Sequence, residues 1–171
     1  HSLTNKGTEK SQKKITPSRI MTSDEALNEA KKVKYKKSKK IILQSTIFEV
    51  IQKLYVDGYL LFIFSGRDQN SLNFTLLNNG IKDYFIEIIG GDSMFQPKPN
   101  PGAIKYILNK YCINKKNILY IGDTDSDFSL AKYAGCKFIA ACWYQNNITL
   151  LTKHKCHNLN DLISCIQRIL K

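Results

Sequence analysis

The sequence of 171 residues lacks long apolar runs and is poor in acidic residues. None of its apolar stretches approaches the roughly 18 residues that a transmembrane helix needs, so we expect no membrane span. Asp and Glu number 14 against 26 Lys and Arg, which gives a formal net charge of +12. Apolar residues still make up 43% of the chain, and a chain of this length can bury one full core.

Cysteines are few and scattered. The chain has five of them, an odd number, and no Cys-x-x-Cys pair. They are Cys112, Cys136, Cys142, Cys156 and Cys165. This usage is typical of a reduced cytoplasm in which most thiols serve as small core residues, so we expect a cytoplasmic protein. His154-x-Cys156-His157 has metal-ligand residue types, but it has no partner pair elsewhere, which favours ordinary strand and loop.

The positive charge is unevenly distributed. Residues 1–40 hold twelve Lys and Arg against four Asp and Glu, whereas residues 41–171 hold fourteen against ten. We expect residues 1–40 to be a basic, partly disordered segment with one helix over 24–35. Solvated surface is the favoured interpretation of this charge, because Lys accompanies Asn and Ile throughout the chain. An arm that binds nucleic acid through phosphate contacts is the less favoured alternative.

From Ile41 onward, extended and helical patterns alternate. All residues of 59–64 are apolar, which is typical of a parallel strand buried on both faces. Further strands are predicted at 84–89, 118–121 and 138–142, with a brief extended piece near Cys156. Helices are predicted over 47–55, 69–79, 102–111, from the turn after Ile121 to Ala134, over 148–152, and from Asn160 to the end. This order predicts an α/β fold with a parallel sheet and right-handed crossovers.

Residues 119–128 combine an apolar run, Gly122 and aspartates at every second position. In open parallel sheets, ligands bind at the carboxyl ends of the strands. Asp123 and Asp127 therefore suit a hard cation held by oxygen ligands. A polar loop with a helix N-cap, in which Asp125 also takes part, is an equally good interpretation of these residues alone.

Polar groups of different kinds follow three of the predicted strands. Ser65 follows the first strand, Lys98 lies in a proline-rich loop after the second, and Asp123 and Asp127 follow the third. Together they offer a hydroxyl donor, an ammonium group and a carboxylate pair. This set fits a phosphoryl group with Mg²⁺, because cations and donors stabilise negative charge spread over phosphoryl oxygens. Each residue alone is a weak signal, and their order and placement make the set specific.

With these motifs the chain resembles the haloacid dehalogenase superfamily of phosphatases, most closely its phosphoglycolate-phosphatase type, from about Ile41 to Lys171. The resemblance implies a three-layer Rossmann-like core with a parallel sheet in residues 41–171. It implies that residues 1–40 include the remnant of a helical cap.

The resemblance also implies roles for the four polar residues. The Ser65 hydroxyl would bind the transferring phosphoryl oxygen, and Lys98 would balance charge at the nucleophile and phosphate. Asp123 would ligate Mg²⁺, directly or through water, and Asp127 would support the metal shell. The implied partner is a small phosphorylated substrate. We expect no membrane partner, and nucleic acid is the less favoured partner.

The family's first motif has no counterpart in this chain. That motif is an apolar strand ending in Asp-x-Asp, which supplies the nucleophile and the general acid/base. Only Asp24 and Asp57 precede Ser65, and neither follows an apolar strand. The missing strand is central in the family, between the strands that end at Ser65 and Asp123. We therefore expect those two strands either to pair directly or to leave exposed edges.

Two explanations of the missing motif remain open. The chain is a fragment of a longer enzyme, which its start at His1 rather than Met favours, or the gene has lost the motif. The resemblance implies a Mg²⁺-dependent phosphomonoester hydrolase of small metabolites such as phosphoglycolate. Covalent transfer needs its nucleophile, so we expect this chain alone to be inactive. The alternative is a non-catalytic module that binds phosphate or nucleic acid.

Overall fold

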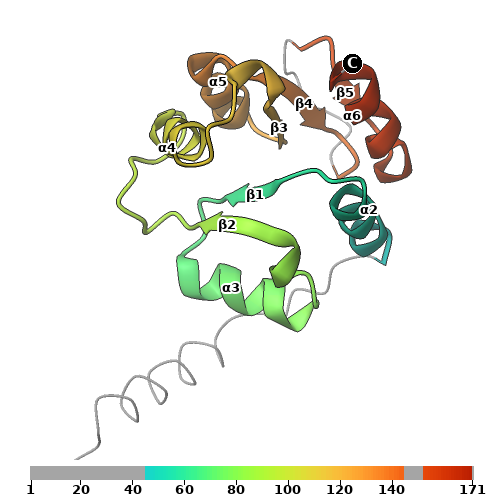
Figure 1. Ribbon diagram of the computed structural model, residues 1–171, viewed down its shortest axis with the longest axis horizontal. Helices are drawn as coiled ribbons and strands as arrows, with labels where there is room; N and C mark the ends of the chain where they lie inside the picture. The colour runs from blue at the N-terminus through green and yellow to red at the C-terminus, as the bar shows by residue number, and fades with distance from the viewer. Residues whose placement is uncertain (1–44, 145–151, 171) are drawn as a thin grey trace, which may run out of the picture. The chain divides into compact units, whose positions relative to one another are not determined.

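The computed structural model describes residues 45–144 and 152–170, all within a compact unit of residues 38–171 (Figure 1). The predicted helix over 24–35, and with it the predicted cap remnant, lies outside the described residues. Most of the short helix predicted over 148–152 lies outside them too. In the described part of the chain, no helix combines the length and apolar character that crossing a membrane requires.

Helices and strands alternate from residue 45 to residue 141, as the sequence predicts. The order is α2 (Ser45–Val56), β1 (Leu61–Phe64), α3 (Gln69–Asn78), β2 (Phe85–Ile89), α4 (Gly102–Lys110), β3 (Leu119–Gly122), α5 (Asp125–Ala134), β4 (Lys137–Ala141), β5 (Lys155–Cys156) and α6 (Leu162–Leu170). Short 3₁₀ helices at Lys82–Tyr84, Lys115–Asn117 and Leu159–Asp161 precede β2, β3 and α6. β1 begins two residues later than predicted, because the Tyr59 N–H bonds to the Leu54 carbonyl and closes the end of α2.

The strands form two sheets rather than one. β1 pairs with β2, and β4 lies between β3 and β5, with every pairing parallel. The helices α3 and α5 connect β1 to β2 and β3 to β4, which gives two βαβ units. Among residues 45–144 and 152–170, no strand pairs with the second edge of β1 or of β3. Of the two outcomes expected for these strands, direct pairing of β1 with β3 does not occur, and both edges are without a partner strand in the described part of the chain.

Helices pack on both faces of the strands. Leu61 of β1 and Leu119 of β3 share an apolar cluster with residues of α2 and α6. Ile63 faces the same way and packs with α3. On the opposite face, Phe64 and Tyr120 share a cluster with α4 and α5. This three-layer arrangement confirms the predicted α/β, Rossmann-like fold (Figure 1).

β1 is less buried than its sequence predicts. All four residues of Leu61–Phe64 are only partly buried, although they contact apolar clusters on both faces. Within residues 45–144 and 152–170 no strand covers the second edge of β1, and a cavity lined by β1 lies beside it.

The cysteines behave largely as the sequence predicts. All five are free thiols, and Cys142 and Cys156 are buried in the core. Burial raises the pKa of the Cys136 and Cys156 thiols to about 11, so both stay protonated at neutral pH. Cys112 is exposed. Among the described residues, His154 and His157 take part in no group of three metal-ligating side chains.

Candidate functional site

Ser65 lies directly after β1, at the end of the sheet formed by β1 and β2. Its backbone N–H donates to the carbonyl of Ile89, the last residue of β2, at 3.0 Å. Its hydroxyl oxygen accepts the backbone N–H of Arg67 at 3.2 Å, which closes the turn after the strand. Ser65 is partly buried, so the turn fixes its hydroxyl while leaving one side accessible.

The loop after β2 is tied to this turn. The Gly91 N–H donates to the Arg67 carbonyl at 2.7 Å, and the Gln69 N–H donates to Asp92 Oδ1 at 2.7 Å. A Cβ on Gly91 would overlap the carbonyl of Gly66, so this approach requires glycine. The Arg67 guanidinium points to α3, where it donates to hydroxyl groups of that helix. The turn after Ser65 is thus held by the loop after β2 on one side and by α3 on the other.

Lys98 is held between aromatic rings and a carboxylate. It lies in the loop between β2 and α4, and its Nζ donates to Asp127 Oδ1 at 2.7 Å. The same Nζ is 5.3 Å from the ring centre of Phe64 and 5.6 Å from that of Tyr120. Both ring distances are within the range of cation–π attraction. The Lys98 side chain keeps 20% of its surface exposed, so its charge is fixed but still reachable.

Asp127 is buried, with both carboxylate oxygens occupied. Oδ1 accepts from Lys98 and from the Tyr120 hydroxyl at 3.1 Å. Oδ2 accepts from the Thr124 hydroxyl at 2.7 Å and from the backbone N–H groups of Thr124 and Asp123 at 3.2 and 3.3 Å. The Thr124 hydroxyl accepts the Asp127 N–H in return, which completes a capping box at the start of α5.

The charge of Asp127 is stabilised despite its burial. Burial by itself would raise the pKa of this carboxyl, but hydrogen bonds from Lys98 and Thr124 outweigh it and hold the pKa below the usual value. For Tyr120, burial and then the charge of Asp127 raise the pKa far above its ordinary value. The phenol therefore stays protonated and donates to the carboxylate.

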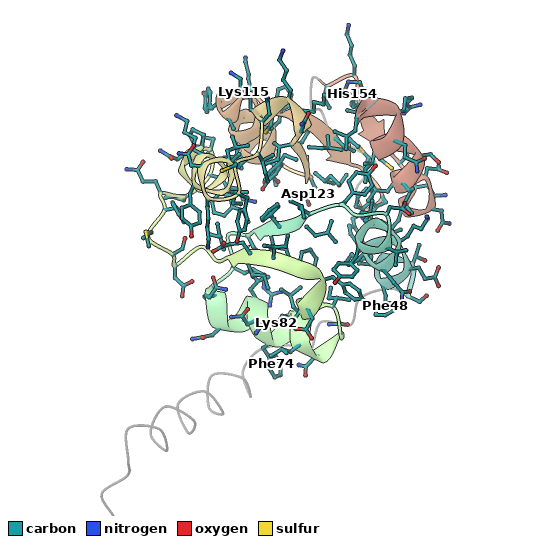
Figure 2. The ribbon with its side chains drawn as sticks, in the orientation of Figure 1. Phe48, Phe74, Lys82, Lys115, Asp123 and His154 are labelled. Atoms are coloured by element: carbon teal, nitrogen blue, oxygen red, sulfur yellow. The ribbon has the colours of Figure 1, made fainter. Side chains whose placement is uncertain are left out.

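Asp123 and Asp125 are exposed, in contrast to Asp127. Asp123 follows β3 and is labelled in Figure 2, and Asp125 is the first residue of α5. Gly122 allows the tight turn between β3 and these aspartates, because a Cβ on residue 122 would lie 2.5 Å from the Cβ of Asp127. The glycine and the buried aspartate thus fix the backbone from which Asp123 projects.

The structure brings the four predicted residues to one end of the strands. Lys98, Asp123 and Asp127 are joined by direct hydrogen bonds. Ser65 is linked to them through its neighbour Phe64, whose ring lies below the Lys98 ammonium and whose carbonyl accepts from the Tyr120 hydroxyl at 3.4 Å.

Sequence reasoning missed two contributors to this site, Tyr120 and Thr124. The Thr-x-x-Asp capping pattern could have indicated Thr124. Tyr120 stood in an apolar run, and nothing in the sequence marked its hydroxyl.

These contacts limit how a metal could be held. Among the residues that the structure describes, no group of three His, Cys, Asp or Glu side chains could form a metal cluster. Asp127 has no oxygen left without a protein donor, whereas Asp123 presents an exposed carboxylate. Proteins commonly bind Mg²⁺ through about one or two carboxylates, with waters and substrate phosphates as the other ligands. Asp123 fits one such position, and the described residues do not complete the site.

The three-layer fold, with polar groups gathered after parallel strands, places the chain among Rossmann-like α/β proteins. The family model for haloacid dehalogenase-like hydrolases matches residues 2–141. The chain therefore belongs to the family of haloacid dehalogenase-like hydrolases. The match begins well before Ile41, so the resemblance to the family is not confined to the residues from Ile41 onward.

Individual relatives agree with the phosphoglycolate-phosphatase type. A phosphoglycolate phosphatase of Vibrio vulnificus (strain CMCP6) is 34% identical over 94 residues, which cover 55% of this chain and 41% of that protein. The crystal structure of a predicted phosphoglycolate phosphatase from Haemophilus somnus is 25% identical, with a TM-score of 0.65 over 70% of this chain and 55% of that one. A HAD-superfamily hydrolase from Ehrlichia chaffeensis shares the fold, at 24% identity and a TM-score of 0.66 over 79% and 62% of the two chains. The chain spans less than half the length of the curated phosphoglycolate phosphatases that it matches.

Proposed function

We propose that this chain carries part of the active site of a Mg²⁺-dependent phosphomonoester hydrolase. The observation that carries the proposal is the Lys98–Asp127 ion pair, held beside the exposed Asp123 and close to the turn of Ser65. Lys98 thus presents a fixed positive charge, Asp123 a free carboxylate and Ser65 a hydroxyl, all at one end of the strands. Residues 41–171 are proposed to be the catalytic core.

Each residue has a distinct task in this proposal. Ser65 donates its hydroxyl hydrogen to a phosphoryl oxygen. Lys98 uses one N–H for Asp127 and directs its positive charge at the phosphoryl group, where negative charge develops during transfer. Asp123 holds Mg²⁺, which when bound adds positive charge at the phosphoryl oxygens. Asp127 acts as a positioning residue, because it holds Lys98 and the backbone of Asp123 in place.

We propose that the chain alone does not complete the reaction. Covalent phosphoryl transfer requires a nucleophile such as an aspartate at the end of a buried strand. Only Asp24 and Asp57 precede Ser65, and Asp57 lies in the turn after α2. Loss of a nucleophile costs on the order of a million-fold in rate in a well-studied catalytic triad. The substrate class we propose is a small phosphorylated metabolite, because the relatives are named phosphoglycolate phosphatases.

The proposal is tested by metal binding and by turnover of p-nitrophenyl phosphate. We expect Mn²⁺, used as a paramagnetic substitute for Mg²⁺, to bind the full chain in the presence of inorganic phosphate. Asp123→Asn should weaken that binding by about tenfold, the effect of about 1.4 kcal/mol. Asp125→Asn is the matched control, since Asp125 is also exposed but lies in α5, and it should leave binding within about twofold.

The outcomes separate the two parts of the proposal. Equal Mn²⁺ affinity of the wild type and Asp123→Asn would show that Asp123 is not a metal ligand. Clear Mg²⁺-dependent turnover that disappears in Asp123→Asn would show instead that the chain alone is an active phosphatase. We expect binding without turnover.

A further inference from the structure

Two of the free cysteines lie next to each other where α6 packs on β5. Cys156 of β5 is buried, with 1% of its surface exposed, and belongs to an apolar cluster that includes residues of α6. Cys165 of α6 packs against the same cluster and keeps part of its surface exposed. A hydrogen bond and a charge interaction between the two side chains place their sulfur atoms within reach of each other. The pair combines one accessible thiol with one that is shielded from solvent.

Cys165 has the surroundings of a reactive thiol. Arg168, one turn further along α6, donates from its Nη2 to Cys165 Sγ at 3.6 Å. A guanidinium beside a sulfur stabilises the thiolate, which is the form of cysteine that attacks peroxides. The thiols of Cys112 and Cys136 each donate to a backbone carbonyl instead. Cys165 therefore differs from both in the charge that faces its sulfur.

Cys156 has the surroundings of a second, protected thiol. Its S–H donates to the carbonyl of Asn158 at 3.1 Å, which fixes the side chain and leaves the sulfur lone pairs free. Burial first, and then the hydrogen bond with Cys165 and its charge, raise the pKa of Cys156 above its ordinary value. An oxidant that arrives from solvent therefore meets Cys165 first, and the product forms beside an intact thiol.

We propose that Cys165 is a site of oxidation by hydrogen peroxide and that Cys156 converts the product into an intramolecular disulfide. The Cys165 thiolate attacks one peroxide oxygen and the O–O bond breaks. The leaving hydroxide takes up the proton that the thiol released and becomes water. The sulfur is oxidised by two electrons to a sulfenic acid, while the peroxide is reduced.

The second step forms the S–S bond. The Cys156 sulfur attacks the sulfenic sulfur of Cys165, the S–O bond breaks, and the departing hydroxide takes the proton of Cys156 to give a second water. The disulfide would fasten α6 to β5 covalently, and a dithiol reductant would reverse it. This inference does not depend on metal or phosphate chemistry.

The test is oxidation of the reduced full chain by hydrogen peroxide, followed by mass spectrometry of peptides prepared without reductant. We expect a link between Cys156 and Cys165 that dithiothreitol removes. It should form at least about tenfold faster than Cys112 is oxidised, because Cys112 is exposed but has a backbone carbonyl as its partner. In urea, Cys136 and Cys142 should pair at least as readily, since they are closer in sequence and the folded contacts are lost.

Single substitutions separate the two roles. Cys165→Ser should abolish the link and leave Cys156 a thiol. Cys156→Ser should let the sulfenic acid accumulate at Cys165, where dimedone traps it. Arg168→Gln should slow the formation of the link by about tenfold, because it removes the guanidinium. Far-ultraviolet circular dichroism checks that each variant is folded.

Cys142→Ala is the matched control for Cys156. The Cys142 N–H donates to the Cys156 carbonyl at 2.8 Å, but its side chain packs in a different cluster, with Phe138 and Ala140. Successive side chains of a strand point to opposite faces, and Cys156 is in register with Ala141. Cys142→Ala should therefore leave the rate of link formation within about twofold.

Four results would overturn the proposal. These are a link in the folded chain that maps to another pair of cysteines or to two chains, a link to Cys156 that persists in Cys165→Ser, equal rates of oxidation at Cys165 and Cys112, and the same preference for the Cys156–Cys165 pair in urea. The last result would mean that closeness in sequence, rather than the contact of α6 with β5, selects the pair.

Discussion

Replacing Asp127 by asparagine tests whether the buried carboxylate organises the site. The carboxylate oxygens accept five hydrogen bonds, from Lys98, Tyr120, the Thr124 hydroxyl and two backbone N–H groups. An asparagine has only one acceptor oxygen, and its NH₂ group would face donors. Asp127→Asn therefore removes the charge partner of Lys98 and weakens the capping box at the same time.

The magnitude follows from these two losses. Removing one partner of a fully buried ion pair costs about 3–5 kcal/mol, and the loss of an N-terminal cap costs about 1 kcal/mol. The Lys98 side chain is 20% exposed, so water recovers part of its solvation, and asparagine keeps part of the cap. We expect the free energy of unfolding to fall by about 2–4 kcal/mol, which with an ordinary dependence on denaturant lowers the urea midpoint by about 1–2 M.

The assay is urea unfolding of the full chain, followed by circular dichroism. Asp125→Asn is the matched control, because Asp125 is an exposed carboxylate in the first turn of the same helix. It should cost at most about 1 kcal/mol, through the helix dipole alone. Adding Lys98→Met to Asp127→Asn should cost less than the sum of the single variants, since the second change removes the unpaired ammonium. A midpoint for Asp127→Asn equal to that of Asp125→Asn would refute this account.

Three further predictions concern the same cluster. The pKa of Asp127 is lowered in the folded state, so its contribution to stability should be full above about pH 5 and lost as the pH falls below the ordinary value of 3.8. The free energy of unfolding, measured with urea at a series of pH values, should therefore fall less steeply toward acid pH in Asp127→Asn than in the wild type. Gly122→Ala should lower the free energy of unfolding by about 1–3 kcal/mol, because the new Cβ meets Asp127. The control Gly66→Ala has open space at its Cβ, so it should change that free energy by at most about 0.5 kcal/mol, both measured by thermal unfolding. Tyr120→Phe should cost about 1 kcal/mol in urea unfolding, since Asp127 keeps its other donors, and no change would mean that the hydroxyl bond is not formed.

The sequence predicted the strands and helices well because hydrophobic periodicity determines both. The strand predicted at 84–89 is β2 within one residue, and the brief extended piece near Cys156 is β5. The boundary at Tyr59 was wrong because a backbone hydrogen bond in the turn after α2 decides it, and such a bond leaves no periodic signal. The separation into two sheets was foreseen only as one of two outcomes, since pairing depends on a neighbour that the periodicity of β1 does not reveal.

The site shows more clearly where the sequence stops being informative. A carboxylate in the turn between a buried strand and a helix suits both a metal ligand and a helix cap. Both roles use the oxygen lone pairs, in one case for a cation and in the other for the free N–H groups of the helix. Spacing therefore could not assign Asp123 and Asp127 to different roles. The geometry distinguishes them by their oxygens, which are fully bonded in Asp127 and exposed in Asp123. The buried hydrogen bonds of Asp127 cap α5 and also include the bond from Lys98, so the capped loop and the charged site are one structure rather than alternatives.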